Sequence, residues 1–172
     1  MATVRARAFH GAIQTAAAPP LRARGFAFDG RATFRRRLEH PGRWALHIVH
    51  FQMGQRSMEG QFTVNLAVYH PALSLVSVTD RPTVGDCPLE MRRRLGFFLH
   101  PPMDRWWPLF EDDPAMTNEI SGLIPLLVDE GLPWLEDVDS GQRIAAVRAI
   151  IEHRRRRHTG EPGVDGPSSD RP

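Results

Sequence analysis

The sequence predicts a single α+β domain, with an antiparallel sheet of about three to five strands and helices packed mainly on one side of it. Three observations predict this fold. Two long strand-like segments, 44–53 and 61–70, are joined by a short polar loop. Apolar residues recur at helical spacing near the start of the chain and in its last third. A length of 172 residues suits one domain of ordinary size but not two full ones.

Near the start of the chain, Phe9 and Ile13 lie four residues apart, which predicts a short amphipathic N-terminal helix. The proline pair at 19–20 is expected to end this helix, because proline lacks the amide hydrogen that a helix interior needs. Further on, Asp29-Gly30 is a strong signal for a tight turn. A small hairpin or an edge strand is therefore expected around it.

The segment 61–70 has the pattern of a half-buried strand. Its even positions from Phe62 to Val68 are apolar, whereas Gln61, Thr63, Asn65 and Tyr69 are polar or amphipathic. The segment 44–53 is apolar at both even and odd positions, which indicates a central or bulged strand.

The register of these two strands decides which side chains share a face. If Met53 lies opposite Gln61, His47 shares a face with Asn65 and Tyr69. This mixed polar and apolar face is where a ligand is first expected. The alternative is that a helix covers the face and that Asn65 and Tyr69 hydrogen bond to backbone groups.

Residues 88–99 are expected to form a helix capped by Asp86, although Gly96 weakens that prediction. The three arginines at 92–94 would occupy helix positions about 100° apart, so at least one of them must face protein. Arg94 is the candidate for this inward guanidinium, which would pair with an acidic side chain or meet an anionic ligand.

The neighbouring rings of Trp106 and Trp107 must point in different directions. One is expected in the core, and the other at its rim or in contact with a partner.

Two helices are predicted in the C-terminal third of the chain. Thr117 would cap the first, at 118–130, and Gly131 would end it. Ser140 would cap the second. The inward face of this last helix is expected to hold Ile144, Val147 and Ile151.

All 22 basic residues other than histidine are arginines, and their charge is unevenly distributed. Residues 1–59 carry ten arginines and three acids (10 − 3 = +7), whereas residues 104–139 carry one arginine and ten acids (1 − 10 = −9). The simplest expectation is that these halves neutralise one another within the fold. An arginine-rich sheet edge that binds nucleic acid is the alternative, with Arg31, Arg35, Arg36 and Arg37 as its candidates.

With Cys87 as its single cysteine, the chain can form no internal disulfide and no cysteine-based zinc site, which fits the cytoplasm. No apolar run approaches the ~18 residues needed to span a membrane, and no secretory signal is evident. Residues 158–172 are poor in apolar side chains and are expected to be a flexible tail that follows a domain at 1–157.

Catalytic and metal-binding motifs are not evident in the sequence. His47 and His50 would point to opposite sides of a strand and cannot chelate together there. The acidic run 111–113 has no histidine at metal-binding spacing, and Cys87, between an acid and a proline, is expected to be structural. There is no nucleophile elbow and no phosphate-binding glycine pattern, so no cofactor is expected.

Six short motifs occur in order over residues 20–140. They are Gly25-Phe26 with Gly30 and Phe34, Val49-His50-Phe51-Gln52, Phe62-Thr63-Val64-Asn65-Leu66-Ala67-Val68-Tyr69, Cys87 with Arg94-Leu95-Gly96, Trp106-Trp107, and Gly131-Leu132-Pro133-Trp134-Leu135. In content and order they resemble a bacterial family known as domain of unknown function 4304, from which the chain departs by one extra residue between Gly30 and Phe34. The resemblance implies a compact bacterial cytosolic α+β domain and brings no activity.

These observations favour a non-catalytic module that binds another protein, with an immunity or antitoxin role in bacterial conflict systems as one form of it. The candidate binding residues are His47, Asn65, Tyr69, Arg94, Trp106 and Trp107. Two alternatives stay open. One is nucleic-acid binding through the arginines at 31–37, and the other is an enzyme whose pocket is lined by His47, Asn65 and Tyr69.

Overall fold

The fold is built on a six-stranded antiparallel sheet, in a computed structural model that describes residues 3–74, 79 and 81–159. The strands are ordered β1-β2-β3-β4-β5, and β6 pairs with the start of β4. Their bounds are Ala27–Phe28 (β1), Thr33–His40 (β2), Arg43–Met53 (β3), Gln61–Tyr69 (β4), Arg92–Arg94 (β5) and Trp107–Pro108 (β6). The predicted α+β class with an antiparallel sheet is confirmed.

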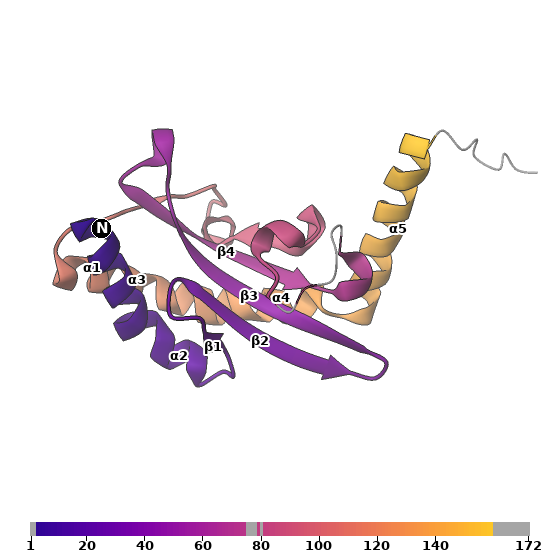
Figure 1. The fold of residues 1–172 in the computed structure, drawn as a ribbon, viewed down its shortest axis with the longest axis horizontal. Coiled ribbons are helices and arrows are strands. Elements are labelled where there is room, and N and C mark those ends of the chain that lie inside the picture. The colour runs from indigo at the N-terminus through magenta and orange to yellow at the C-terminus, as the bar shows by residue number, and fades with distance from the viewer. Residues whose placement is uncertain (1–2, 75–78, 80, 160–172) are drawn as a thin grey trace, which may run out of the picture.

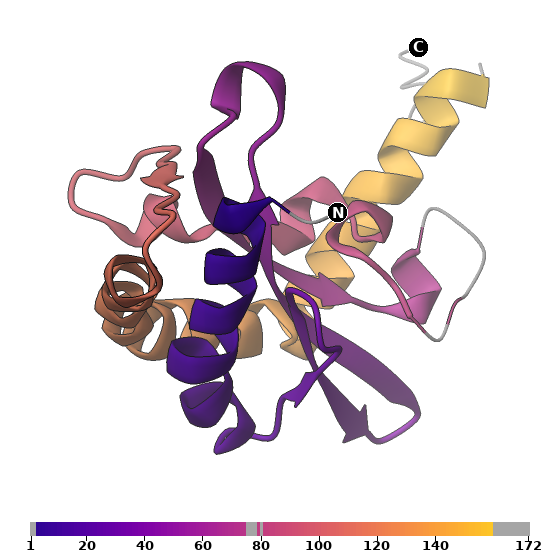
Figure 2. The ribbon, with the colours of Figure 1, turned by 60° about the vertical axis from the view of Figure 1, so that its left-hand side comes forward.

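The longer helical segments lie on one side of this sheet, and residues 81–91, which lead into β5, lie over the other (Figures 1 and 2). None of the helices in the described ranges is long and apolar enough to cross a membrane. The helical segments are α1 (Val4–Ala12), the π-helical η1 (Ile13–Ala17), α2 (Ala18–Arg22), α3 (Asp113–Leu126), the π-helical η7 (Leu127–Gly131), α4 (Leu132–Val138) and α5 (Gly141–Thr159). Short 3-10 turns are η2 (Arg56–Met58), η3 (Pro71–Leu73), η4 (Val84–Asp86), η5 (Leu89–Met91) and η6 (Leu95–Phe98).

The central hairpin β3–β4 is confirmed, but its predicted register is wrong. Met53 pairs with Phe62 rather than with Gln61. The ladder continues one pair further, because the Gly54 amide donates to the Gln61 carbonyl (2.7 Å), and the chain then turns through Arg56, which has a φ of 57°. Since side chains alternate along a strand, this single step exchanges the partners on the two faces.

The face that the helices cover, here called the helix face, carries the main core. Phe34, Val49, Phe51, Val64 and Leu66 lie on it and are buried. Residues from α1, η1, α3 and α4, including the predicted pair Phe9 and Ile13, pack against them. Burial of this many apolar side chains is the main force that holds the helices on the sheet.

The opposite face of the sheet, here called the second face, holds the row Thr33, His50, Asn65 and Arg94 and the parallel row Arg35, Ile48, Ala67 and Arg92. A smaller buried cluster covers part of it. This cluster consists of Leu46, Ile48, Ala67, Tyr69 and Cys87.

The N-terminal helix does not end at the prolines as predicted. Pro19 and Pro20 occupy the first turn of α2, which follows the π-helical turn directly. The change from π-helical to α-helical hydrogen bonding at this point lets the chain continue through the two prolines, which have no amide hydrogen. The hairpin at Asp29-Gly30 forms as expected, with Gly30 at a φ of 82° and β1 paired to β2.

The helix predicted at 88–99 is wrong. These residues form the turns η5 and η6 on either side of the edge strand β5. Pairing with β4 holds 92–94 extended, and Gly96 approaches the Met103 carbonyl so closely that a Cβ atom would lie 2.5 Å from it. Contacts distant in sequence therefore override the local helical pattern.

The two C-terminal helices form, with different limits. The first begins at Asp113, where Asp112 rather than Thr117 accepts a capping hydrogen bond, and it passes through Gly131 into α4 by a π-helical turn. Ser140 caps α5 as predicted, through a hydrogen bond from the Arg143 amide. The residues predicted on the inward face of this helix, Ile144, Val147 and Ile151, are buried. Helix α5 extends to Thr159 and so includes the first two residues of the expected tail, and residues 160–172 lie outside the described ranges.

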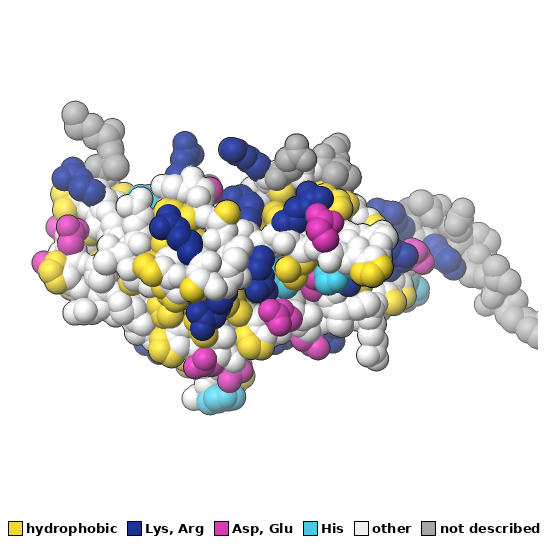
Figure 3. All heavy atoms as spheres, turned by 90° about the horizontal axis from the view of Figure 1, so that it is seen from below, with side chains coloured by type: hydrophobic (Ala, Val, Ile, Leu, Met, Phe, Trp, Pro, Cys, Tyr) yellow, Lys and Arg dark blue, Asp and Glu magenta, His cyan; other side chains and the backbone are white. Residues whose placement is uncertain are grey.

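The basic and acidic parts of the chain meet in ion pairs, as expected for intramolecular neutralisation. Arg5 pairs with Glu111 (3.0 Å), and Arg43 pairs with Asp139 (2.6 Å). On the side of the molecule shown in Figure 3, basic, acidic and apolar side chains are interspersed. A single large patch of one charge is not visible in that view.

Candidate binding site on the second face

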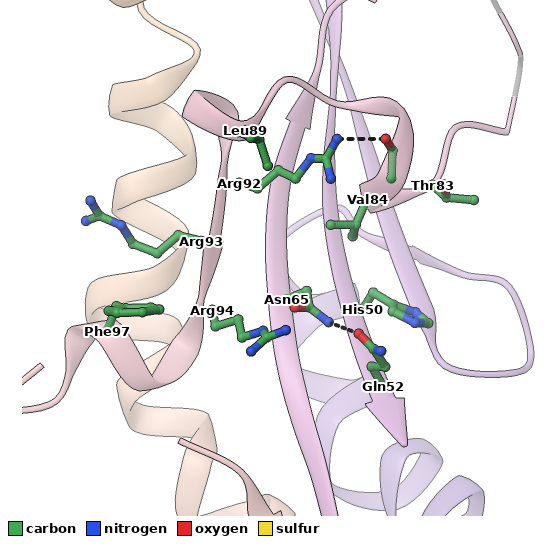
Figure 4. Close-up of a pocket in the computed structure, with 11 residues that line it drawn as sticks. His50, Gln52, Asn65, Thr83, Val84, Leu89, Arg92, Arg93, Arg94 and Phe97 are labelled. Carbon is green, nitrogen blue, oxygen red and sulfur yellow. Dashed lines mark hydrogen bonds between the residues drawn. The ribbon is translucent and has the colours of Figure 1, made fainter. Parts of the chain in front are cut away.

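A hollow of about 610 Å³ opens on the second face, beside the edge strand β5 and the turn η4. We call it the arginine hollow, and Figure 4 shows its lining. It is lined by His50, Gln52, Asn65, Thr83, Val84, Gly85, Leu89, Arg92, Arg93, Arg94 and Phe97. None of these lining residues is acidic.

The pairing of β5 with β4 determines where the arginines point. Arg94 lies opposite Asn65 and Arg92 lies opposite Ala67, so both side chains extend over the second face. Arg93, one position between them, points away from the hollow toward aromatic rings on the other side (Figure 4). Two of the three guanidinium groups can therefore meet a ligand.

Arg92 extends across the hollow and holds the segment around the turn η4 in place through hydrogen bonds. Its Nη2 donates to the Gly85 carbonyl (2.7 Å) and its Nε donates to the Cys87 carbonyl. Among the described residues Arg92 forms no salt bridge. Hydrogen bonds from Thr83 lower the pKa of the half-buried Asp86 carboxyl, and the charge of Arg92 lowers it further. Carbonyl groups bear no net charge, so much of the positive charge of Arg92 is not neutralised.

Arg94 forms the ion pair that the sequence predicted. Its Nη1 donates to Asp104 (2.7 Å), and its guanidinium lies 5.1 Å from the centre of the Trp106 ring. Within the described part of the chain no hydrogen bond occupies its Nε or Nη2. The planar group is thus oriented by two neighbours while it keeps donors for an anion.

The floor of the hollow is polar and largely uncharged. Gln52 accepts a hydrogen bond from the Asn65 amide (2.8 Å), and the His50 Nδ1 lies 3.0 Å from the Thr33 hydroxyl oxygen. Burial lowers the pKa of His50, and the positive charge of Arg35 acts in the same direction, whereas Asp29 opposes them. His50 is therefore neutral near pH 7. Amide and imidazole groups of this kind can hydrogen bond to a peptide backbone.

Apolar side chains stand at the rim of the hollow. Leu89 is 70% exposed and Phe97 is 44% exposed, which places both among the few large hydrophobic side chains that the described surface exposes. Exposed apolar groups beside a polar hollow commonly mark a site of interaction with a partner. The arginine hollow thus combines positive charge with apolar surface.

Of the predicted binding residues, Asn65 and Arg94 line the hollow, but His47 and Tyr69 do not. His47 and Tyr69 are both fully buried and lie on opposite faces of the sheet. Tyr69 packs with its ring 5.8 Å from that of Trp44. The prediction that one face of the sheet holds His47, Asn65 and Tyr69 is wrong, because the register differs by one residue. The enzyme pocket predicted on that face is therefore wrong as well.

His47 belongs to a buried polar cluster instead. The Asp139 carboxylate, 3% exposed, accepts hydrogen bonds from Arg43 (2.6 Å) and His40 (2.7 Å), and the His47 Nε2 lies 3.3 Å from it. Burial alone would raise the pKa of Asp139, but the contacts with His47, Arg43 and His40 hold it well below its usual range. This cluster joins the end of α4 to the β2–β3 hairpin and has a structural role.

The two tryptophans divide as predicted. Trp107 is buried in the core, with its ring 6.0 Å from that of Phe62. Trp106 is half-buried at the surface beside Arg94.

The predicted arginine edge is split between the two faces. Arg35 and Arg37 lie on the second face, and Arg31 is exposed in the turn before β2. Arg36 lies on the helix face, where it donates to Glu136 (2.9 Å) and packs over Phe26. The four residues therefore cannot form one continuous surface.

Cys87 has no features of a reactive thiol. It is fully buried, and burial raises its pKa to about 12. Among the described residues, no group of three or more histidine, cysteine or acidic side chains could hold a metal ion.

Of the eleven residues that line the hollow, the sequence patterns identified two, Asn65 and Arg94, as binding residues. Five of the nine missed residues carry the chemistry of the site. These are His50, Gln52, Leu89, Arg92 and Phe97. The correct strand register would have put His50 and Gln52 beside Asn65, and alternation within an extended 92–94 would have paired Arg92 with Arg94.

Comparison with known proteins gives no relative of this chain. No family model matches it, and neither the curated proteins nor the solved structures include a match.

Proposed function

We propose that this protein is a non-catalytic binding module that takes a segment of another protein into the arginine hollow. The segment would carry at least one acidic side chain and an adjacent apolar one. The observation that carries this proposal is the placement of Arg92 and Arg94 on the same side as the exposed Leu89 and Phe97. Arginine and large apolar groups together are typical of residues that dominate protein interfaces.

The polar floor supports a peptide rather than a small inorganic anion as the ligand. Gln52, Asn65 and neutral His50 offer donors and acceptors that an isolated phosphate would not require. A volume of about 610 Å³ is enough for several side chains. An acidic side chain at Arg94 with an apolar neighbour against Phe97 would use both features at once.

Nucleic-acid binding is the second candidate. Arg35 and Arg37 share the second face with Arg92 and Arg94, which favours a polyanion of some kind. The aromatic groups of this face are poorly placed for base stacking, because Tyr69 is fully buried and the guanidinium of Arg37 lies 4.3 Å from the Trp44 ring centre. Base stacking is a main source of affinity for single strands.

A cytoplasmic location fits the proposal, because the buried thiol of Cys87 suits a reducing compartment. An immunity or antitoxin role, and membership of the family of domain of unknown function 4304, remain predictions from the sequence.

The proposal is tested by capture on the immobilised full chain, identification of the captured proteins, and measurement of each binary affinity with purified components. The double substitution Arg94→Gln and Phe97→Ser should weaken a specific complex by roughly a hundredfold, since two central contacts are lost. The matched control is Arg7→Gln with Ile150→Ser, which changes exposed residues of α1 and α5. Equal affinity of both double variants, each folded by circular dichroism, would exclude the arginine hollow as the binding site.

A further inference from the structure

A second basic hollow, of about 980 Å³, lies on the same face over β1 and β2. Four arginines line it: Arg31, Arg35, Arg37 and Arg81. Among the described lining residues, Asp29 is the one acid. Burial tends to raise the pKa of Asp29, but bonds from Arg31, Thr33 and Arg35 lower it overall, so the group is ionised. The lining of this hollow therefore carries a net positive charge, as does that of the arginine hollow.

A narrow neck lies between the two hollows. It has a volume of about 90 Å³ and lies between the turn at Thr83 and Val84 and the strands β2 and β3. The neck shares Arg35 with the second hollow, and it shares His50, Thr83 and Val84 with the arginine hollow. The three spaces thus adjoin one another across the second face, and we call them together the trough.

The arginines of the second hollow differ in how far they are already engaged. Arg35 donates to the Pro82 carbonyl and to Asp29, and Arg37 pairs with Glu39. In the described ranges, Arg31 and Arg81 are exposed and their side chains form no ion pair or hydrogen bond. Two guanidinium groups are therefore available to a ligand, beside two others that hold the hollow in shape.

We infer that the trough binds one extended acidic segment of a protein, with one acidic cluster in each hollow. This inference rests on the proposed function and specifies the chemistry of the partner. Charge complementarity supports it, because the described linings of the three spaces include one acid, Asp29, and six arginines other than Arg93, which points away. Three of these six, Arg31, Arg81 and Arg92, form no ion pair among the described residues. Steering by such a field would also speed association.

The geometry of the sheet sets the spacing of the two clusters. From Arg94 to Thr33 the trough crosses three strand spacings, and from His50 to Leu46 it advances four residues along β3. At ~4.8 Å per strand and ~3.3 Å per residue these distances are about 14 and 13 Å, or about 19 Å along the diagonal. An extended chain covers that distance with about five to six residues.

Synthetic peptides test this inference by calorimetric titration of the full chain. The bipartite peptide carries a Glu-Glu-Leu group and a Glu-Glu pair, separated by a Gly/Ser spacer of about five residues. One control replaces the terminal Glu-Glu pair by Gln-Gln, and another shortens the spacer to one residue. The bipartite peptide should bind roughly tenfold or more tightly than either control, because its second contact is intramolecular.

Two protein variants assign the clusters to the hollows. The double variant Arg31→Gln and Arg81→Gln should remove the gain from the second cluster and leave the affinity of the single-cluster control unchanged. Arg94→Gln should weaken both peptides, and Arg7→Gln should weaken neither.

The outcomes separate this inference from the proposed function. Binding of the single-cluster peptide without any gain from the second cluster overturns the bipartite trough and leaves the proposed function standing. If the single-cluster peptide does not bind, or binds equally well to Arg94→Gln, the proposed function fails. Tighter binding of a single-stranded oligonucleotide than of the bipartite peptide, at equal salt, overturns the choice of a protein as the partner.

Discussion

Replacement of Asp139 by asparagine should destabilise the fold far more than its small change in volume suggests. The Asp139 carboxylate is 3% exposed and holds Arg43 and His40 at 2.6 and 2.7 Å. In the variant an amide NH₂ must face one of these donors, and the positive charge of Arg43 loses its partner. Breaking a buried ion pair in this way costs about 3–5 kcal/mol.

The lower end of this range is expected here. Arg43 and His40 are partly exposed, with 23% and 32% of their side-chain surface accessible, so water can solvate them again. A loss of about 3 kcal/mol corresponds to a fall in melting temperature of roughly 6–12 °C for a domain of this size. Urea and thermal unfolding, followed by circular dichroism, measure both quantities. The control is Glu136→Gln, because Glu136 is 62% exposed in its ion pair with Arg36 and its loss should cost less than about 1 kcal/mol.

The effect of Asp139→Asn should depend on pH. The folded-state pKa of Asp139 is lowered, so its stabilisation is complete above the unfolded pKa of about 4 and is lost as the pH falls through the folded value. The wild type and Asp139→Asn should therefore converge in stability below about pH 4. If Asp139→Asn cost no more than Glu136→Gln, or if the difference did not change with pH, the account of the buried cluster would be refuted.

Three further predictions concern other parts of the fold. Burial lowers the folded-state pKa of both His50 and His70, so the free energy of unfolding should decline as the pH falls below the unfolded value of about 6.5. The substitution His70→Leu should reduce that decline in urea titrations at several pH values, and an unchanged pH profile would contradict the prediction. A Cβ atom at Gly54 would lie 2.0 Å from the Met58 carbonyl oxygen, so Gly54→Ala should lower the free energy of unfolding by about 2–3 kcal/mol. Gly122→Ala, in open space within α3, should raise it by up to about 1 kcal/mol, and equal effects of the two variants in denaturant melts would disprove the steric argument. The buried Cys87 thiol, with its pKa raised to about 12, should resist iodoacetamide at pH 8 in the native protein and react when the protein is unfolded. Mass spectrometry measures this alkylation, and rapid alkylation of the native protein would count against the burial of Cys87.

The sequence patterns predicted those elements whose limits depend on local periodicity and capping. The β3–β4 hairpin was predicted to within one residue, and the helix capped by Ser140 has the expected inward residues. In both cases local preference and burial agree, so the pattern was sufficient.

The candidate site could not be predicted in the same way, because it depends on contacts between distant residues. The register of the hairpin, in which the Gly54 amide bonds to the Gln61 carbonyl, puts His47 on the helix face and His50 beside Asn65. The hollow also needs Arg92 and Arg94 on an extended edge strand, in a segment whose pattern is helical. That strand exists because β4 offers a free edge, which no property of residues 88–99 reveals.

Hydrogen–deuterium exchange of the full chain with and without its captured partner tests the central claim most directly, because it locates the interface without any substitution. We predict that binding slows exchange in β5 (Arg92–Arg94), in η6 (Leu95–Phe98) and in the turn η4 (Val84–Asp86), and leaves α1 (Val4–Ala12) unchanged. Protection confined to the helices, with none around the arginine hollow, would contradict the account.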